Sequence, residues 1–258
     1  MPMVLSERRG AVAVLTLNNP EQYNALIDSL LKEFDAALDA ALADTSVRSI
    51  VVTGAGKGFC SGAQLGGDLF NLGEGVSSLL RDNVNPLITK MRNAKVPIVV
   101  AVNGPAAGAG VGIALAGDIV IAARSARFVL SFVKLGAALD AGTSLLLQRS
   151  IGVARARALA LLAEPLSAEK AEQWGLIWKT VDDAALFEEA LAIAQRLAEG
   201  PPISIGLIKA LVEEGWSAPL AGALDDEAAA QVRAFVTEDL REGAAAFVQK
   251  RLPRFTGR

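Results

Sequence analysis

The sequence predicts an α/β fold in which helices cover a largely parallel sheet, followed by a helical C-terminal region. The chain has 258 residues, of which 52% are hydrophobic, so roughly three quarters of its unfolded surface can be buried around one large core. Strand-like segments alternate with segments of helical period in the first half, which is typical of parallel pairing. After about Leu145 the helical segments follow one another with little strand character between them.

Four segments of the first half have the β-branched or alternating character of strands. They comprise residues 11–17, 49–53, 97–103 and 118–122. Between the first two, residues 24–42 have the period of an amphipathic helix. The expected apolar face of this helix consists of Leu26, Leu30, Leu31, Phe34, Leu38 and Leu42.

The second half is expected to be mostly helical, with one further strand at residues 176–181. The expected helices comprise residues 154–162, 167–174, 183–199, 203–215 and 219–237. Gly200, Pro201 and Pro202 form a stop-and-restart signal between two of these helices. We therefore expect a core at residues 1–200 and a helical region at residues 201–258, whose apolar faces need the core or a second copy of the chain.

The composition excludes several classes of function. The chain contains no histidine, so neither a Ser-His-Asp system nor a His-ligated zinc site can operate. A net charge of −3 without a long basic run argues against nucleic-acid binding. The single cysteine, Cys60, excludes internal disulfides and is expected to be a small packing residue. Because no apolar run reaches ~18 residues, we expect no membrane span and a cytoplasmic protein.

Two glycine-rich segments each follow a predicted strand. Residues 54–65 lack the Ser or Thr that follows the lysine of a phosphate-binding loop, and residues 103–112 have neither the spacing nor the later acid of a dinucleotide site. Such segments present unpaired backbone N–H groups at helix starts, and two of them could form an oxyanion hole. The alternative is that the glycines only permit tight turns and close helix packing.

Five ordered motifs give the chain a resemblance to the enoyl-CoA hydratase/isomerase (crotonase) family, from near the first strand to the C-terminus. They comprise Asn19-Pro20-Glu21-x-x-Asn24-Ala25-Leu26, Ser61-Gly62-Ala63, Asn103-Gly104-x-Ala106-x-Gly108-x-Gly110 with Ala114-x-x-x-Asp118, Leu166-Ser167-Ala168-Glu169-x-Ala171-x-x-Trp174-Gly175-Leu176, and Arg241-Glu242-Gly243-x-x-Ala246-Phe247-x-x-Lys250-Arg251. The resemblance implies a crotonase-like spiral of ββα units with a C-terminal helical trimerisation region. It also implies an acyl-CoA thioester as substrate, no separate cofactor or metal, and a homotrimer or a dimer of trimers.

The resemblance further implies which residues form the site. The backbone N–H groups of Ala63 and Ala109 take the oxyanion-hole positions, where one such donor is typically worth ~3–4 kcal/mol of barrier. The residues implied to bind the acyl-CoA are Ala25, Ser61, Gly62, Gln64, Leu65, Gly110, Phe132, Leu139 and Lys250. Phe132 and Leu139 would keep the pocket dry. Lys250 would contact the CoA phosphates across a subunit boundary, with a solvated surface lysine as the alternative.

Function within the family depends on the acids beside the hole. The family's hydratases use two glutamates, and this chain has Gly112 and Phe132 at those positions. Asp140 remains, at a position where the family's isomerases carry an acid, although by itself it could equally be a helix N-cap. An apolar pocket would raise the pKa of Asp140 and let this one carboxyl both remove and return a proton.

We therefore expect an acyl-CoA isomerase that moves a double bond, or one that opens a ring epoxide to an oxepin as the family's phenylacetate-degradation branch does. Residues 138–143, Ala-Leu-Asp-Ala-Gly-Thr, depart from that branch, which has proline before the acid and paired glycines after it. The alternatives are an enoyl-CoA hydratase that uses Asp140 alone and a catalytically weak acyl-CoA-binding subunit. Asp118, in an apolar turn between a helix and a strand, is expected to have a structural role.

Overall fold

The fold is built on a six-stranded sheet that is parallel except at one edge. The computed structural model describes residues 1–64, 66 and 73–258 of the chain. The strand order is β1-β2-β3-β4-β6-β9; β1 and β2 pair antiparallel, and the other neighbours pair parallel. The strands are β1 (Val4–Arg9), β2 (Val12–Leu17), β3 (Ser49–Gly54), β4 (Ile98–Val102), β6 (Ile119–Ala123) and β9 (Lys179–Val181).

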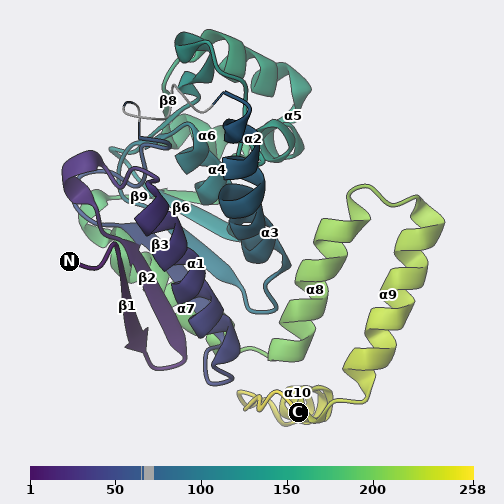
Figure 1. The fold of residues 1–258 in the computed structure, drawn as a ribbon. Coiled ribbons are helices and arrows are strands. Elements are labelled where there is room, and N and C mark those ends of the chain that lie inside the picture. Colours follow the sequence, from purple (N-terminus) through teal and green to yellow (C-terminus); the bar gives the residue numbers. More distant parts are fainter. Residues whose placement is uncertain (65, 67–72) are drawn as a thin grey trace.

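Helices cover both faces of this sheet. Strands β3 and β4 are buried along almost their whole length, as is typical of parallel strands that are covered on both sides. Helix α1 (Asp28–Ala43) lies in front of the sheet in Figure 1, and α7 (Leu186–Ala198) lies behind it. The face that α1 buries consists of Leu30, Leu31, Phe34, Leu38 and Ala41.

A second, smaller sheet and several helices complete the core. This sheet has the order β5-β7-β8 and comprises β5 (Ala106–Ala107), β7 (Arg127–Val129) and β8 (Leu166–Ser167). The helices are α2 (Gly75–Leu79), a π-helical turn (Leu80–Val84), α3 (Asn85–Asn93), α4 (Ala109–Leu115), α5 (Thr143–Leu162) and α6 (Ala168–Trp174). Three short 3₁₀ segments lie at Pro20–Gln22, Ser131–Leu135 and Asp183–Ala185. Every residue of α4 is buried, so this helix is a fixed platform within the core.

The C-terminal helices form an arm that projects from the core (Figure 1). The arm comprises α8 (Pro202–Gly215), α9 (Leu220–Phe235) and α10 (Glu238–Gln249). In the described chain α9 buries none of its residues. The large apolar side chains that α8, α9 and the adjoining loops expose are Ile208, Val212, Trp216, Leu220, Leu224, Val232, Phe235 and Val236. The described chain therefore exposes a broad apolar surface on the arm.

Several element boundaries differ from the prediction. The N-terminal segment forms a hairpin of two strands, because the chain turns at Gly10, whose φ is 64°. The first helix starts at Asp28 and not at residue 24, since Tyr23 and Asn24 have left-handed φ values of 50° and 56°; Leu26 pairs with Ala63 as an isolated bridge instead. None of the helices among the described residues has the length and apolar character needed to cross a bilayer.

Candidate active site

Two asparagine side chains hold the first glycine-rich loop. The fully buried Asn24 amide donates to three carbonyl oxygens of residues 55–59, at 2.9–3.0 Å. Asn103 accepts the Gly54 N–H at 3.1 Å and donates to the Gly56 and Gly58 carbonyl oxygens, at 3.0 and 3.2 Å, the second of which also accepts from Asn24. These bonds satisfy backbone groups that the irregular loop leaves unpaired. Both asparagines lie in the family motifs, but the sequence alone indicated no role for either.

The end of this loop packs against the start of α4. The Ala107 N–H donates to the Cys60 carbonyl oxygen at 2.9 Å. Gly62 has a φ of 79°, and a methyl group on its Cα would lie 2.7 Å from the Ala107 oxygen and 3.2 Å from the Ala109 nitrogen. Only glycine fits between the two segments here. The residue that follows it, Ala63, is thereby held close to Ala109.

The backbone N–H groups of Ala63 and Ala109 are not used by the rest of the described chain. Ala109 is the first residue of α4, after Gly108 at a φ of 53°, and the first N–H groups of a helix have no partner within it. Neither N–H donates to an acceptor among the described residues. The two donors that the resemblance implied therefore lie near each other, one of them at the positive end of a helix dipole.

A turn before α5 brings the chain around Asp140 to the same helix. A methyl group on Gly112 would lie 2.3 Å from the Ala141 oxygen and 2.7 Å from its Cβ, so Ala141 packs directly on α4. Gly112 follows Ala109 by three residues, which is about 4.5 Å along a helix. Asp140 directly precedes Ala141 in the chain. The point where Ala141 contacts α4 is therefore about one helical turn from the Ala109 N–H. The close contact also explains why position 112 has no room for a side chain.

The Asp140 carboxyl is partly buried and incompletely paired. Its Oδ1 atom is buried and has no hydrogen-bond partner in the described chain. Burial raises the pKa of this carboxyl from 3.8 to about 6, because desolvation disfavours the charged form. The alternative interpretation of Asp140 as a helix N-cap is wrong, since Gly142 occupies the N-cap position of α5 and no side chain caps it.

Phe132 and Ala25 lie near these loops. The buried Phe132 ring covers Gly108, where a methyl group would lie 3.8 Å from the ring Cζ. Ala25 is buried, and the next residue, Leu26, donates its N–H to the Gly62 oxygen at 2.8 Å. The structure therefore places both residues beside the glycine-rich loops.

The other predicted binding residues vary in position. Ser61 donates its hydroxyl to a backbone oxygen at 3.0 Å, Gln64 is exposed and Leu139 is half-buried against the core. Gly110 packs on the loop end, where an added methyl group would lie 2.3 Å from the Cys60 oxygen. Leu65 lies outside the described residues. Lys250 is exposed just after the last turn of α10, which lies at the bottom of Figure 1, well away from α4. Within a single chain the structure does not bring Lys250 to the site.

The raised pKa of Asp140 predicts how stability depends on pH. Between 3.8 and about 6 the native state retains a proton that the unfolded chain has lost, so stability falls as the pH rises through this window. Asp140→Asn is expected to raise the free energy of unfolding by on the order of 1–2 kcal/mol above about pH 7, after allowance for partial exposure. Urea unfolding near pH 4 should show little difference. An equal effect at both pH values would contradict the assigned cause.

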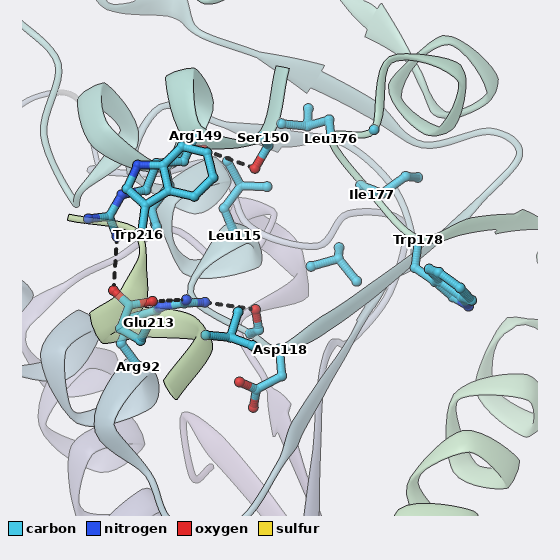
Figure 2. A pocket seen from close by; sticks show the side chains of 15 residues that line it. Arg92, Leu115, Asp118, Arg149, Ser150, Leu176, Ile177, Trp178, Glu213 and Trp216 are labelled. Atoms are coloured by element: carbon cyan, nitrogen blue, oxygen red, sulfur yellow. Dashed lines mark hydrogen bonds and ion pairs between the residues drawn. The ribbon is translucent and has the colours of Figure 1, made fainter. Parts of the chain in front are cut away.

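A separate cavity of about 400 Å³ lies where α8 meets the core (Figure 2). None of the described residues predicted for the site lines it. Glu213 of α8 forms ion pairs with Arg92 and with Arg149, the latter at 3.1 Å. The Arg149 guanidinium also lies over the Trp216 ring, 5.7 Å from its centre. The cavity therefore lies at the junction between the core and the arm, and residues of both line it.

Asp118 lies at the same junction and has the structural role that was expected. Its Oδ2 accepts the Ile98 N–H at 2.7 Å and the Lys209 ammonium at 2.8 Å. Lys209 comes from α8 and also donates to the Met91 carbonyl oxygen at 3.0 Å. Asp118 therefore ties the arm to the end of α4.

Neither a reactive thiol nor a metal cluster accompanies the site in the part of the chain that the structure describes. Burial raises the pKa of the Cys60 thiol to about 12, so this side chain stays protonated and packs in the core, as a structural cysteine does. No three His, Cys, Asp or Glu side chains among the described residues lie close enough together to hold a metal ion.

The fold and the two loops define a known class of enzyme. The sequence profile of the enoyl-CoA hydratase/isomerase family matches residues 7–258. The chain belongs to this family of hydratases and isomerases. The predicted crotonase fold is confirmed by a solved enoyl-CoA hydratase from Polaromonas sp. JS666, with a TM-score of 0.92 at 34% identity over 98% of this chain and 99% of that one.

Two curated relatives from Escherichia coli K12 narrow the comparison. A 1,2-epoxyphenylacetyl-CoA isomerase is 42% identical over the full length of both chains. A 2,3-dehydroadipyl-CoA hydratase is 34% identical, again over the full length of both. Relatives of both reaction types thus resemble the whole chain, and the residues of the site have to distinguish between them.

Proposed function

We propose that the protein is an acyl-CoA isomerase that moves a double bond, with Asp140 as its acid/base. The observation that supports this most strongly is the Asp140 carboxyl, which is partly buried, has an Oδ1 atom without a partner in the described chain and has a pKa of about 6. A carboxyl of this kind is ionised enough near neutral pH to accept a proton, and weak enough as a base to return it.

The proposed reaction converts a 3-enoyl-CoA into the conjugated 2-enoyl-CoA. The Asp140 carboxylate removes a proton from the α-carbon, and the electron pair of that C–H bond moves toward the thioester oxygen to form a dienolate. The protonated carboxyl then gives the proton to the γ-carbon. The electron pair returns to the carbonyl, and the double bond lies between the α- and β-carbons. CoA enters as part of the substrate, and the reaction needs no metal or redox cofactor.

The N–H groups of Ala63 and Ala109 are proposed to donate to the dienolate oxygen. How much these donors lower the reaction barrier depends on whether they are in place before the negative charge develops. The bonds that Asn24 and Asn103 make to the first loop, and the close contact of Gly62 with the start of α4, support this because they hold both donors without help from a substrate.

The test is isomerisation of a 3-enoyl-CoA in deuterated water, followed by mass spectrometry and NMR. Formation of the conjugated 2-enoyl-CoA with deuterium in its carbon skeleton is the expected result. A 3-hydroxyacyl-CoA formed from added 2-enoyl-CoA, without isomerisation, would favour the hydratase. Binding of the thioester without any exchange would favour the catalytically weak acyl-CoA-binding subunit.

A hydratase is the second candidate because full-length relatives carry that name. Against it stand Gly112 and Phe132, which occupy the positions of the two hydratase glutamates. The close contact between Gly112 and Ala141 further disfavours an acid at position 112. Asp140 would have to activate water and protonate the α-carbon alone.

The packing of Gly112 on Ala141 yields a prediction of its own. Gly112→Ala places a methyl group 2.3 Å from the Ala141 oxygen, so the turn that carries Asp140 must shift. We expect a loss of about 1–3 kcal/mol in unfolding free energy and an isomerisation rate at least ~10-fold lower, because small misplacements of a catalytic group are costly. The control is Gly215→Ala, where an added methyl group meets nothing within 4 Å. Indistinguishable results for the two variants would contradict this account.

The first candidate substrate is a CoA thioester with an alkenyl acyl chain, and the second is one whose acyl group carries a ring epoxide. The 42% identity with the E. coli 1,2-epoxyphenylacetyl-CoA isomerase supports trying the ring epoxide, whose product would be an oxepin. The departure of residues 138–143 from that branch lies beside the acid itself. It is therefore the simple 3-enoyl-CoA that is assayed first.

We also propose a cytoplasmic homotrimer or dimer of trimers, in which residues 201–258 contact other copies. The apolar side chains that the arm exposes, such as Val212 and Phe235, support this, because their exposure in a free protomer is unfavourable. Lys250 would then contact the CoA of a neighbouring copy. Sedimentation equilibrium should give three or six times the chain mass of 26.8 kDa, and a monomer would contradict the proposal.

A further inference from the structure

Thr143 holds the main chain of Asp140 with two hydrogen bonds. Its N–H donates to the Asp140 carbonyl oxygen at 2.9 Å, and its hydroxyl donates to the same oxygen at 2.7 Å. The Thr143 side chain is fully buried. Both donors of this residue are thus directed to the backbone of Asp140, and the carboxyl receives neither.

The two residues between Asp140 and Thr143 have an unusual backbone conformation. Ala141 and Gly142 have left-handed φ values of 48° and 74°, which for alanine costs roughly 1–2 kcal/mol. Ala141 is buried and packed on Gly112. A strained conformation of this kind persists when its surroundings over-determine it. The two hydrogen bonds of Thr143 therefore close the turn, and the contact of Ala141 with Gly112 fixes its position against α4.

An aspartate just before a helix has a competing local conformation. Its carboxylate can accept a backbone N–H two or three residues further on, as in an Asx turn or an N-cap. For Asp140 those N–H groups belong to Gly142 and Thr143. In the structure the carbonyl oxygen, not the carboxyl, accepts the Thr143 N–H. A carboxylate that accepted these bonds would be stabilised in its charged form and would be a weaker base.

We propose that Thr143 is a positioning residue: by binding the Asp140 carbonyl oxygen through its hydroxyl and N–H, it keeps the Asp140 carboxyl from capping α5 and leaves it free for the substrate. This inference rests on the proposed function of Asp140. The hydroxyl is the decisive group, because every residue except proline would supply the N–H.

The experiment compares Thr143→Val, which keeps the shape but removes the hydroxyl, with Thr143→Ser, which keeps the hydroxyl. Two quantities are measured: kcat and KM for 3-enoyl-CoA isomerisation, and the pKa of the Asp140 carboxyl by NMR of protein carrying ¹³C-labelled aspartate. The Asp140 signal is assigned by its loss in Asp140→Asn. The matched control is Thr53→Val, because the Thr53 hydroxyl is a buried donor to the Ala101 carbonyl oxygen at 2.9 Å in the central sheet.

We expect Thr143→Val to lower kcat at least ~10-fold with KM changed less than ~2-fold, since Thr143 acts through another residue. The pKa of Asp140 should fall from about 6 toward its ordinary value of 3.8. Thr143→Ser should restore both quantities, and Thr53→Val should change neither. If Thr143→Val fails to fold, Thr143→Ala against Thr143→Ser supplies the same comparison.

An unchanged kcat and an unchanged Asp140 pKa in Thr143→Val would overturn the positioning role. So would a loss of kcat that Thr53→Val reproduces without a change of the Asp140 pKa, since that pattern reports general destabilisation. Either result leaves the proposed function intact as long as Asp140→Asn abolishes exchange. Full exchange in Asp140→Asn would instead overturn the proposed function itself.

Discussion

Replacing Asp140 by asparagine is expected to slow α-proton exchange and isomerisation about 10³-fold, within the 10²–10⁴-fold range of general acid–base catalysis. Asparagine preserves the shape of the side chain but can neither accept nor return the proton. Binding of a 3-enoyl-CoA, measured by calorimetry, should change little, because the thioester oxygen and the CoA make their contacts elsewhere. In the unaltered protein the rate should rise as the pH increases through about 6, when the carboxyl becomes ionised.

The control for this experiment is Asp44→Asn. Asp44 is an exposed carboxyl that follows α1 and pairs with Arg8, so its loss should leave both the rate and the pH profile unchanged. If the Asp140→Asn variant keeps its activity, another acid must transfer the proton, and Asp140 has no part in the mechanism. A variant that loses binding together with exchange would mean that Asp140 helps to hold the substrate.

Breaking the ion pair between Asp118 and Lys209 is expected to have the largest effect on stability. The Lys209 side chain is 9% exposed and that of Asp118 is 19% exposed. Burial raises the pKa of Asp118 and lowers that of Lys209, each against the opposing influence of the other charge. Lys209→Met leaves the Asp118 carboxylate without its cation, which should cost about 3–5 kcal/mol of unfolding free energy.

Urea unfolding of three variants checks this prediction. The double variant Asp118→Leu with Lys209→Met should be more stable than Lys209→Met alone, because it leaves no unpaired charge. The control is Lys32→Met, which removes the exposed pair between Lys32 and Asp28 on α1 and should cost less than about 0.5 kcal/mol. Equal losses for Lys209→Met and Lys32→Met would show that the buried pair has no special role in attaching α8 to the core.

Local sequence patterns were sufficient for most of the main sheet and for helices α1 and α6 to α9, but they did not predict α2 or α3. Strands β3, β4 and β6 and helices α6 to α9 lie within a few residues of their predicted bounds, because burial on both faces of a strand or one face of a helix produces a period that is visible in the sequence. The hairpin of β1 and β2, the small β5-β7-β8 sheet and the start of α5 at Thr143 were not predicted. Each depends on turns or on pairing between distant segments, which leave no such period.

The sequence by itself determined the family, the two glycine-rich loops and Asp140 as the acid that remains, because these depend on residue types at fixed spacings. It could not decide whether Asp140 caps a helix or faces a substrate. The tertiary structure decided that question in one respect: Gly142 occupies the N-cap position, and the Asp140 carbonyl oxygen accepts both Thr143 donors. It also revealed the contact of Gly112 with Ala141 and the attachment of α8 through Lys209. The physical reason is that desolvation and hydrogen-bond competition depend on which distant segments pack around a group, and spacing along the chain does not record that packing.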